Sequence, residues 1–257
     1  MGTNGKLTPA DWGGYMPVHN SIAGRAPYYY RDTECVVVEY LTDADHALSI
    51  LPSDLELFEP ATAFMVIETN HWTTIGPYSE VYVGVLCLWK GELHAYVPGV
   101  YVTGESSQLI GRELYGFGKK RASRVELTRH DTGQIEAAMD IRPGDGALRA
   151  TMRTDRNEPA SAIGTLPLIC LRVIPDVAGG ATPALAQLTS VLFAANPIVG
   201  SDGKAEVYSG PGTMSCGSPS DVALPIMRLL SFKYAHFNAD LPYGKVLKTY
   251  TEKELGG

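Results

Sequence analysis

Short segments of alternating polar and apolar residues, divided by turns, constrain the fold of this chain more than any other feature. The segments cover residues 33–40, 62–70, 79–90, 92–103, 122–129, 134–142, 147–155 and 166–174. Alternation of this kind is typical of β-strands with one buried face. Short links such as Lys90-Gly91-Glu92 suit hairpins but not the long crossovers that parallel strands need. The pattern therefore predicts an antiparallel sheet system, curled into a barrel.

Helical signals are few and short. Asp43 can cap a helix over residues 44–51, and Thr103 or Ser106 can cap a second helix that ends near Gly116. Residues 220–250 mix the periods of helix and strand, so no element is predicted there. Because no repeat, linker or low-complexity tract divides the chain, residues 1–257 form one predicted domain. The predicted fold class is mainly β (α+β), an antiparallel β-barrel or double sheet with a few short helices.

Composition and charge exclude several classes of protein. Charged residues make up 19% of the chain and the net charge is −7, so a nucleic-acid binder, which must neutralise phosphates, is not expected. The longest apolar stretches, 81–89 and 166–174, are shorter than the roughly 18 residues that span a bilayer. The N-terminus has no apolar core of a secretory signal, which predicts a cytoplasmic protein.

Standard motifs for metals and nucleotides are not found. The six histidines and four cysteines show no metal-type spacing. Neither a G-x-S-x-G elbow nor a glycine-rich phosphate loop is present. We therefore do not expect a dedicated metal site, and serine-nucleophile, nucleotide and dinucleotide functions lose support.

The most unusual segment runs from Gly111 to Lys120 and reads GRELYGFGKK. A short helix is expected to stop at glycine there, and two lysines follow two aromatic residues. A free lysine has a pKa of about 10.4, so it is rarely neutral at pH 7 and attacks carbonyl groups poorly. Burial among Tyr115, Phe117 and apolar strands would lower that pKa and produce a nucleophile.

Extended backbone sends the side chains of Lys119 and Lys120 to opposite faces, so only one of them can enter an apolar interior. Desolvation would then be the main cause of a lowered lysine pKa, and repulsion from the second lysine would add to it. The alternative, that both lysines are ordinary solvated residues of a loop, stays open on the motif alone.

The lysine segment resembles the active-site segment of the acetoacetate decarboxylase superfamily, where G-R-E-L and a lysine pair recur at this spacing. Gly76-Pro77-Tyr78-Ser79-Glu80, residues 40–51 and the stretch from Ala239 to Tyr250 are also similar in order and spacing. The resemblance therefore covers most of the chain. It implies a β-barrel enzyme without a cofactor, usually a homo-oligomer, whose first lysine of the pair forms an imine with a keto acid.

Carried over by position, the resemblance implies that Lys119 is the nucleophile, Lys120 the adjacent cation and Glu80 the acid that moves protons. Alternation supports the place of Glu80, because Tyr78, Glu80 and Tyr82 share one strand face. A solvent-facing Glu80 is the alternative. The further residues that could bind substrate are Arg112, Glu113, Tyr115, Phe117 and Tyr250, for which structural roles also remain open.

The chain departs from the family pattern at three positions. Gly118 stands where a proline often precedes the lysine pair. In an ungapped comparison, an arginine and a second pocket glutamate of the family fall on Thr33 and Met65, which would place Met65 at the substrate. Arg31, which would share a strand face with Thr33, and Glu68 are candidates to replace these charges. Loss of both charges would spare the imine chemistry but put decarboxylation in doubt.

A protonated imine stabilises a neighbouring carbanion as an enamine. Loss of carbon dioxide from a β-keto acid gives such a carbanion, and so does removal of a methyl proton from pyruvate by Glu80 or a tyrosine. The pyruvate enamine can add to an aldehyde and then lose water. This condensation-dehydration is the leading hypothesis, and decarboxylation of acetoacetate or another β-keto acid is the alternative. A small-ligand-binding β-barrel without catalysis, or an oligomerisation module, would not need Lys119.

Overall fold

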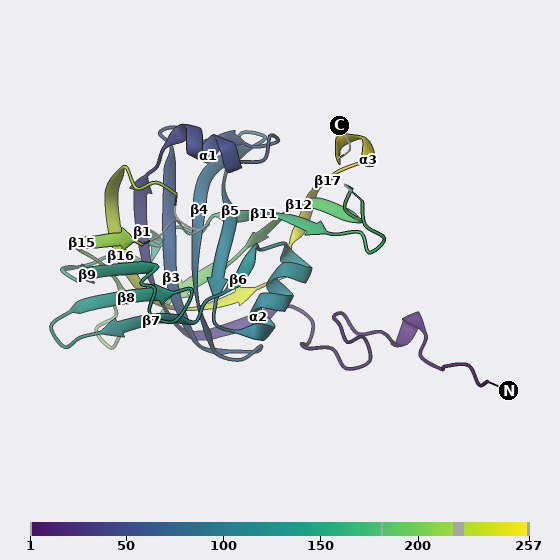
Figure 1. The fold of residues 1–257 in the computed structure, drawn as a ribbon. Coiled ribbons are helices and arrows are strands. Elements are labelled where there is room, and N and C mark those ends of the chain that lie inside the picture. The colour runs from purple at the N-terminus through teal and green to yellow at the C-terminus, as the bar shows by residue number, and fades with distance from the viewer. Residues whose placement is uncertain (1, 181, 218–223, 256–257) are drawn as a thin grey trace.

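The computed structural model describes residues 2–180, 182–217 and 224–255, and its body consists of two β-sheets (Figure 1). Four long neighbours form the middle of the larger sheet, namely β1 (Tyr28–Leu41), β3 (Thr62–Thr73), β4 (Tyr78–Trp89) and β5 (Glu92–Val102). Beyond β1 lies β16 (Arg228–Leu241), and beyond β5 lies β11 (Pro167–Ile174). The same sheet includes β2 (Glu56–Leu57), β6 (Lys119–Arg121), β10 (Arg156–Asn157), β12 (Leu185–Leu192), β13 (Ala194–Pro197), β14 (Val207–Ser209) and β17 (Lys245–Thr249).

The smaller sheet packs across one face of the larger sheet. Figure 1 shows its strands crossing β3 and β4 at a steep angle. Val38, Met65 and Val81 of the larger sheet share one buried hydrophobic cluster with Val125 and Met139 of the smaller sheet. This packing removes apolar surface from water and supplies a large part of the core. The strands of the smaller sheet are β7 (Arg124–Arg129), β8 (Gln134–Asp140), β9 (Leu148–Arg153) and β15 (Gly212–Cys216).

The opposite face of the same long strands carries a second buried cluster, which includes Tyr30, Cys35, Val66 and Tyr78. Successive residues of a strand point to opposite faces, so Val66 lies in this cluster while Met65 lies in the first. The middle strands are therefore covered on both sides, and polar residues on the second face are buried among apolar ones.

A β-bulge in β1 changes which of its residues face the second cluster. Asp32 has a positive φ of 56°, and the pairing of β1 with β16 shifts register between Tyr30 and Thr33. Tyr30 and Thr33 are both buried, whereas Arg31 is only half-buried and Asp32 is exposed. The extra residue thus lets Tyr30 and Thr33 face the same side although they are three residues apart.

The helices are short and mostly lie where the sequence predicts them. Helix α1 (Ala44–Ile50) begins after Asp43, whose side chain accepts a hydrogen bond from a backbone N–H of the first turn, as predicted. Helix α2 (Glu105–Ile110) begins after Gly104, so the predicted caps Thr103 and Ser106 are wrong. It continues into a π-helical turn, η2 (Gly111–Tyr115), which ends at Gly116 with a φ of 83°. The other short helices are η1 (Pro9–Asp11), η3 (Ala160–Ala162) and α3 (Glu252–Leu255).

The strand pattern and the hairpin pairing predicted from the sequence are confirmed. The pairs β4–β5, β7–β8 and β8–β9 are antiparallel. Two parallel pairs, β5–β6 and β5–β11, go beyond the prediction. In the described residues the strand order runs from β10 to β17 without returning to its start, which fits the double sheet of the prediction. The unassigned residues 220–250 contain β16 and β17, and positions 220–223 lie outside the described residues.

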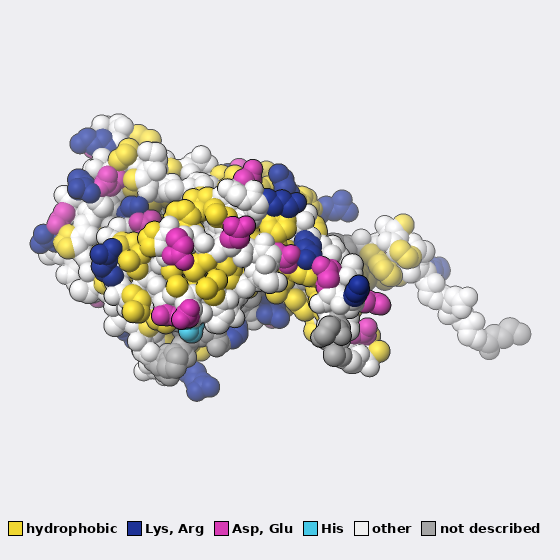
Figure 2. Space-filling view, turned by 90° about the horizontal axis from the view of Figure 1, so that it is seen from above, with side chains coloured by type: hydrophobic (Ala, Val, Ile, Leu, Met, Phe, Trp, Pro, Cys, Tyr) yellow, Lys and Arg dark blue, Asp and Glu magenta, His cyan; other side chains and the backbone are white. Residues whose placement is uncertain are grey.

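The surface adds three observations. The N-terminal end of the described chain extends away from the body of the molecule (Figure 1), whereas Tyr15 is buried in the second cluster and its hydroxyl contacts that of Tyr28. From above, hydrophobic side chains gather near the middle of the face, with acidic side chains among and around them (Figure 2). Within the described ranges, none of the helices has the length and apolar character that crossing a bilayer requires.

Candidate active site

Lys119 is the first residue of β6, which runs parallel to β5 with Val100 opposite Lys119. Only 6% of Lys119 is exposed, whereas Lys120 is an exposed residue. The two lysines thus take opposite sides of the strand, as expected for extended backbone. It is the side chain of Lys119 that enters the interior, and the side chain of Lys120 does not.

The GREL turn shapes the space around Lys119. A Cβ atom at Gly111 would lie 2.7 Å from Lys119 Cδ, which is closer than two non-bonded carbon atoms approach. Glycine at this position therefore gives the lysine side chain its path past the helix. Arg112 donates a hydrogen bond of 3.3 Å from its guanidinium group to the backbone oxygen of Lys119, so it holds the lysine backbone and is exposed itself.

The amine of Lys119 has two hydrogen-bond acceptors. Lys119 Nζ lies 2.7 Å from Glu80 Oε2 and 2.8 Å from Ser107 Oγ. The ring centroids of Tyr78 and Phe117 lie 5.3 Å and 5.7 Å from the same nitrogen. Burial removes water from the ammonium group, while the carboxylate supplies a countercharge and the ring faces add cation–π contacts. A proton acceptor is therefore in direct contact with the amine.

Glu68 on β3 is a second carboxyl group, directly opposite Glu80 on β4. It is 2% exposed. Glu68 Oε1 accepts a hydrogen bond of 2.8 Å from Asn70 Nδ2, and Asn70 Oδ1 accepts one of 2.9 Å from Thr33 Oγ1. Burial, and then the nearby charge of Glu80, raise the pKa of Glu68 to about 8. At neutral pH the site therefore holds one carboxyl group that is mainly protonated.

Three tyrosines surround the carboxyl pair. The hydroxyl oxygens of Tyr30 and Tyr78 are 3.1 Å apart, and Tyr82 continues the same face of β4. Burial, followed by the negative charge of the nearby glutamates, raises the pKa of all three phenols. They stay neutral and can donate hydrogen bonds to a negatively charged group.

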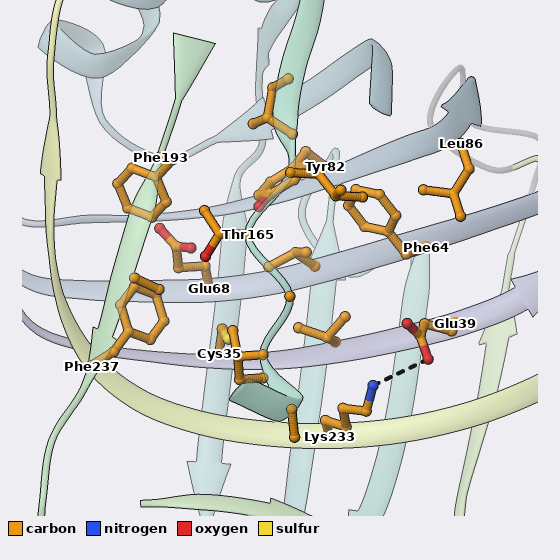
Figure 3. Close-up of a pocket in the computed structure, with 18 of the residues that line it drawn as sticks. Cys35, Glu39, Phe64, Glu68, Tyr82, Leu86, Thr165, Phe193, Lys233 and Phe237 are labelled. Carbon is orange, nitrogen blue, oxygen red and sulfur yellow. Dashed lines mark hydrogen bonds and ion pairs between the residues drawn. The ribbon is translucent and has the colours of Figure 1, made fainter. Parts of the chain in front are cut away.

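These side chains line a cavity of about 40 Å³, here called the lysine pocket. A second cavity of about 160 Å³ adjoins it, and Figure 3 shows residues that line it. Glu68, Tyr82, Leu168 and Phe193 line both cavities. Within the described part of the chain, no group of three or more His, Cys, Asp or Glu side chains is placed to hold a metal ion. The remaining residues of the lysine pocket are Tyr30, Tyr78, Glu80, Val100, Phe117, Lys119 and Leu241.

Arg31 and Met65 do not lie where the sequence comparison places them. Arg31 pairs with Asp240 at 2.9 Å and has 43% of its side chain exposed, because the bulge at Asp32 keeps it off the inner face. Met65 is buried in the cluster that faces the smaller sheet, since it lies three residues from Glu68 and so points the other way. The predicted pocket positions of Arg31 and Met65 are therefore wrong, and Glu68 supplies the second carboxyl group.

Tyr250, Glu113 and Tyr115 also make contacts outside the lysine pocket. The hydroxyl of Tyr250 donates a hydrogen bond of 2.7 Å to Asp54 Oδ2, and Tyr250 does not line the lysine pocket, so its predicted place at the substrate is wrong. The backbone oxygen of Glu113 accepts a hydrogen bond of 2.7 Å from Arg172 Nε. Tyr115 donates one of 2.9 Å to the oxygen of Pro242 and lines a small recess beside Lys119. Tyr115 thus supports the wall behind the lysine.

Sequence reasoning missed Ser107, Tyr30, Leu168 and Phe193. Helical spacing could have found Ser107, because residues 107 and 111 are four apart and share one helix face. Leu168 and Phe193 reach the site through the pairing of β11 with β5 and with β12. No short-range pattern in the sequence predicts that pairing.

Comparison with known proteins identifies the family. A family model described as acetoacetate decarboxylase matches residues 15–251. Acetoacetate decarboxylase 1 of Bradyrhizobium diazoefficiens is 29% identical over 243 residues, 89% of each chain. The crystal structure of acetoacetate decarboxylase from Legionella pneumophila is 25% identical, with a TM-score of 0.81, and the match covers 97% of this chain and 99% of that one. MppR, an enduracididine biosynthesis enzyme solved with pyruvate, shares the fold at 19% identity and a TM-score of 0.77, over 93% of this chain and 98% of its own. The resemblance read from the lysine segment is confirmed, and the chain belongs to the acetoacetate decarboxylase family.

Proposed function

We propose that this protein is an imine-forming lyase that makes or breaks a carbon–carbon bond in a small keto acid, with Lys119 as the nucleophile. The observation that carries the proposal is the buried amine of Lys119, 2.7 Å from Glu80 Oε2 in a cavity that Glu68 also lines. Membership of the acetoacetate decarboxylase family supports a lyase.

Imine formation requires the amine as a free base. Glu80 takes the ammonium proton through the hydrogen bond already present, and Nζ of Lys119 attacks the ketone carbon. The ketone oxygen then collects two protons and leaves as water; one of these protons returns from Glu80 and the other comes from Nζ itself. The product is a protonated C=N bond between the substrate carbon and Nζ.

With pyruvate, the leading reaction is condensation with an aldehyde followed by dehydration. Glu80 removes a proton from the methyl group, and the electrons of that C–H bond form the enamine. The enamine carbon bonds to the aldehyde carbon, while the protonated Glu68 gives its proton to the aldehyde oxygen. Loss of the second proton from the former methyl carbon expels the hydroxyl group as water. Hydrolysis of the imine releases an unsaturated keto acid and restores Lys119.

The two carboxyl groups support this sequence of steps because their surroundings differ. Glu80 contacts the cation of Lys119, whereas Glu68 contacts Asn70 and has a raised pKa of about 8. A pair of titratable groups in different environments can supply an acid and a base in one site. The larger cavity next to Glu68 supports the proposal further, since a condensation needs space for a second reactant.

Decarboxylation of acetoacetate or another β-keto acid by the same imine is the second candidate. Among the described residues that line the lysine pocket, Lys119 is the single cation and becomes the imine, so a substrate carboxylate would face Glu80 and Glu68 with no second cation to pair with it, although the neutral tyrosines can donate hydrogen bonds to it. An unpaired carboxylate in an apolar site favours its own loss as carbon dioxide, because that loss removes the buried charge. The names of the curated relatives favour this candidate as well.

Reduction of the imine tests the proposal directly. Borohydride added with pyruvate or acetoacetate should fix the substrate on Lys119, which peptide mass spectrometry would detect. Lys119→Ala should give no adduct, and the matched control Lys120→Ala should still give one. Carbon dioxide from acetoacetate would then favour decarboxylation, and an ultraviolet-absorbing enone from pyruvate plus an aldehyde would favour condensation. If no keto acid in a broad panel is trapped, the protein is better described as a small-ligand-binding barrel.

A further inference from the structure

The larger cavity has a volume of about 160 Å³ and lies along the inner face of the long strands. Val37 of β1, Val66 of β3 and Phe237 of β16 line it from the sheet, and Ile163 and Leu166 line it from the segment after η3. Figure 3 shows Glu68 and Phe193 toward one end and the pair of Glu39 and Lys233 toward the other. The end at Glu68 is the one that meets the lysine pocket.

The absence of a side chain at Gly84 helps to shape this cavity. The ring of Phe64 lies over Gly84 on the neighbouring strand, and a Cβ atom at position 84 would be 2.3 Å from Phe64 Cζ. The glycine therefore lets the ring of Phe64 lie against β4 instead of standing up into the cavity. Phe64, Leu86 and Tyr82 then form one wall of apolar surface.

Several of the polar groups that line this cavity already have partners. Glu39 and Lys233 pair with each other at 3.3 Å, and the hydroxyl of Thr62 donates to the oxygen of Pro60. Glu68 accepts a hydrogen bond from Asn70, and burial raises the pKa of the Cys35 thiol, which keeps it neutral. A sugar or a phosphate would find few hydrogen-bond partners here, whereas an apolar group would match the walls.

We propose that this cavity holds an apolar ring carried by the aldehyde, the second reactant, so that the substrate class is an aromatic or similarly bulky apolar aldehyde. The proposal rests on the proposed function. An aldehyde carbon next to Glu68 and the Lys119 enamine leaves its substituent in the larger cavity, because Glu68, Tyr82, Leu168 and Phe193 line both spaces. The size fits, since an apolar cavity of about 150 Å³ is known to hold benzene.

Substitutions that fill the cavity test this inference. With pyruvate as the donor, wild-type protein should use benzaldehyde at least about tenfold more efficiently than acetaldehyde, measured as kcat/KM. Val37→Phe should lower that ratio by about tenfold or more, and Ala195→Phe, which fills the cavity from β13, should do the same if Val37→Phe does not fold. Val246→Phe on exposed β17 is the matched control and should leave the ratio within about twofold. If the enzyme decarboxylates, benzoylacetate and acetoacetate replace the two aldehydes and carbon dioxide is measured.

A binding measurement separates this inference from the proposed function. Toluene, followed by NMR titration, should bind wild-type protein and Lys119→Ala equally, and at least about tenfold more weakly to Val37→Phe. Toluene binding without any borohydride adduct would contradict the proposed lyase activity but support the larger cavity as a binding site for an apolar ring, here called the ring site. An adduct on Lys119 with an unchanged aldehyde ratio and no toluene binding would overturn the ring site and keep the lyase.

Discussion

Glu34 and Glu68 are two buried carboxyl groups on neighbouring strands of the larger sheet, and they face opposite sides of it. Glu34 is 8% exposed and Glu68 is 2% exposed, so burial alone would treat them alike. Their partners differ. Glu34 accepts hydrogen bonds from Tyr234 and His71 and pairs with Arg129 at 2.9 Å, whereas Glu68 accepts a hydrogen bond from the neutral amide of Asn70 and has Glu80 as its cross-strand neighbour.

The difference in partners reverses the effect of burial on the two pKa values. Burial on its own would raise the pKa of Glu34, but the hydrogen bonds of Tyr234 and His71 and the charge of Arg129 together bring it below its usual range. Burial and the charge of Glu80 raise the pKa of Glu68 to about 8. On one face of the sheet the carboxylate joins two sheets, and on the other face a protonated acid is kept beside a lysine. Neighbouring charges, more than depth, decide which role a buried glutamate takes.

The largest effect on activity should come from Glu68→Gln. An amide cannot transfer a proton, so the rate of the condensation or decarboxylation should fall on the order of a hundredfold. Glu34→Gln is the matched control, because it makes the same substitution at a buried glutamate on the other face and should leave the borohydride adduct on Lys119 intact. Initial rates and adduct yield would be measured in parallel. An unchanged rate for Glu68→Gln would remove Glu68 from the mechanism.

Stability should respond in the opposite order. Glu34→Gln leaves Arg129 without its carboxylate and should lower the free energy of unfolding by about 2 kcal/mol. Glu68→Gln should cost less or stabilise the protein at pH 8, because it removes a carboxyl group that ionises at a cost. Urea unfolding of both variants checks this comparison. It would break down if Glu68→Gln were the more destabilising of the two.

The two glutamates should also give stability opposite dependences on pH. The pKa of Glu68 is raised from 4.5 to about 8, so its contribution is present below pH 4.5 and is lost as the pH rises toward 8, by up to about 1.4 kcal/mol per unit. The pKa of Glu34 lies below 4.5, so its contribution is present at neutral pH and is lost only as the pH falls through the lowered value. Unfolding of each Gln variant against wild type, from a pH below the lowered pKa of Glu34 up to about pH 8, measures both trends. Parallel trends would show that the two carboxyl groups share one environment.

The smallest effects should follow from Arg31→Ala and Tyr250→Phe. Arg31 pairs with Asp240 and is partly exposed, Tyr250 binds Asp54, and neither residue lines the lysine pocket. Each variant should change kcat/KM by less than about threefold, within the range of surface substitutions. Steady-state assays on purified variants suffice as the measurement. A tenfold loss in Arg31→Ala would mean that a charge on the outer side acts on the pocket.

The first half of the fold follows from local signals in the sequence, and the second half does not. β3, β4 and β5 are joined by short turns, so their limits and pairing are predictable although both faces of these strands are covered. β16 pairs with β1, almost two hundred residues away along the chain, and both of its faces carry buried residues. Alternation is weak in a strand that is covered on both sides, which explains why residues 220–250 gave no clear period.

The candidate site also has residues that the sequence predicts and residues that it does not. Alternation along single strands is enough to place Glu80 beside Tyr78 and to send Lys119 and Lys120 to opposite sides. Whether Met65 or Glu68 enters the lysine pocket depends on the register of β3 against β4, which a sequence comparison does not show. Ser107 depends on where α2 packs. The chemistry of the pocket was thus visible in the sequence, whereas its second carboxyl group required the pairing of strands.

The bulge at Asp32 has a consequence for how relatives of this chain are compared. It determines which residues of β1 face the interior, so that Tyr30 and Thr33 both point inward and Arg31 points outward. In a homologue with the same residues and no bulge, an inward Thr33 would bring Arg31 inward and turn Tyr30 outward. Which charges enter such a pocket therefore depends on the bulge as well as on residue identity. Arginines that align in sequence can lie on opposite faces of the strand in two relatives.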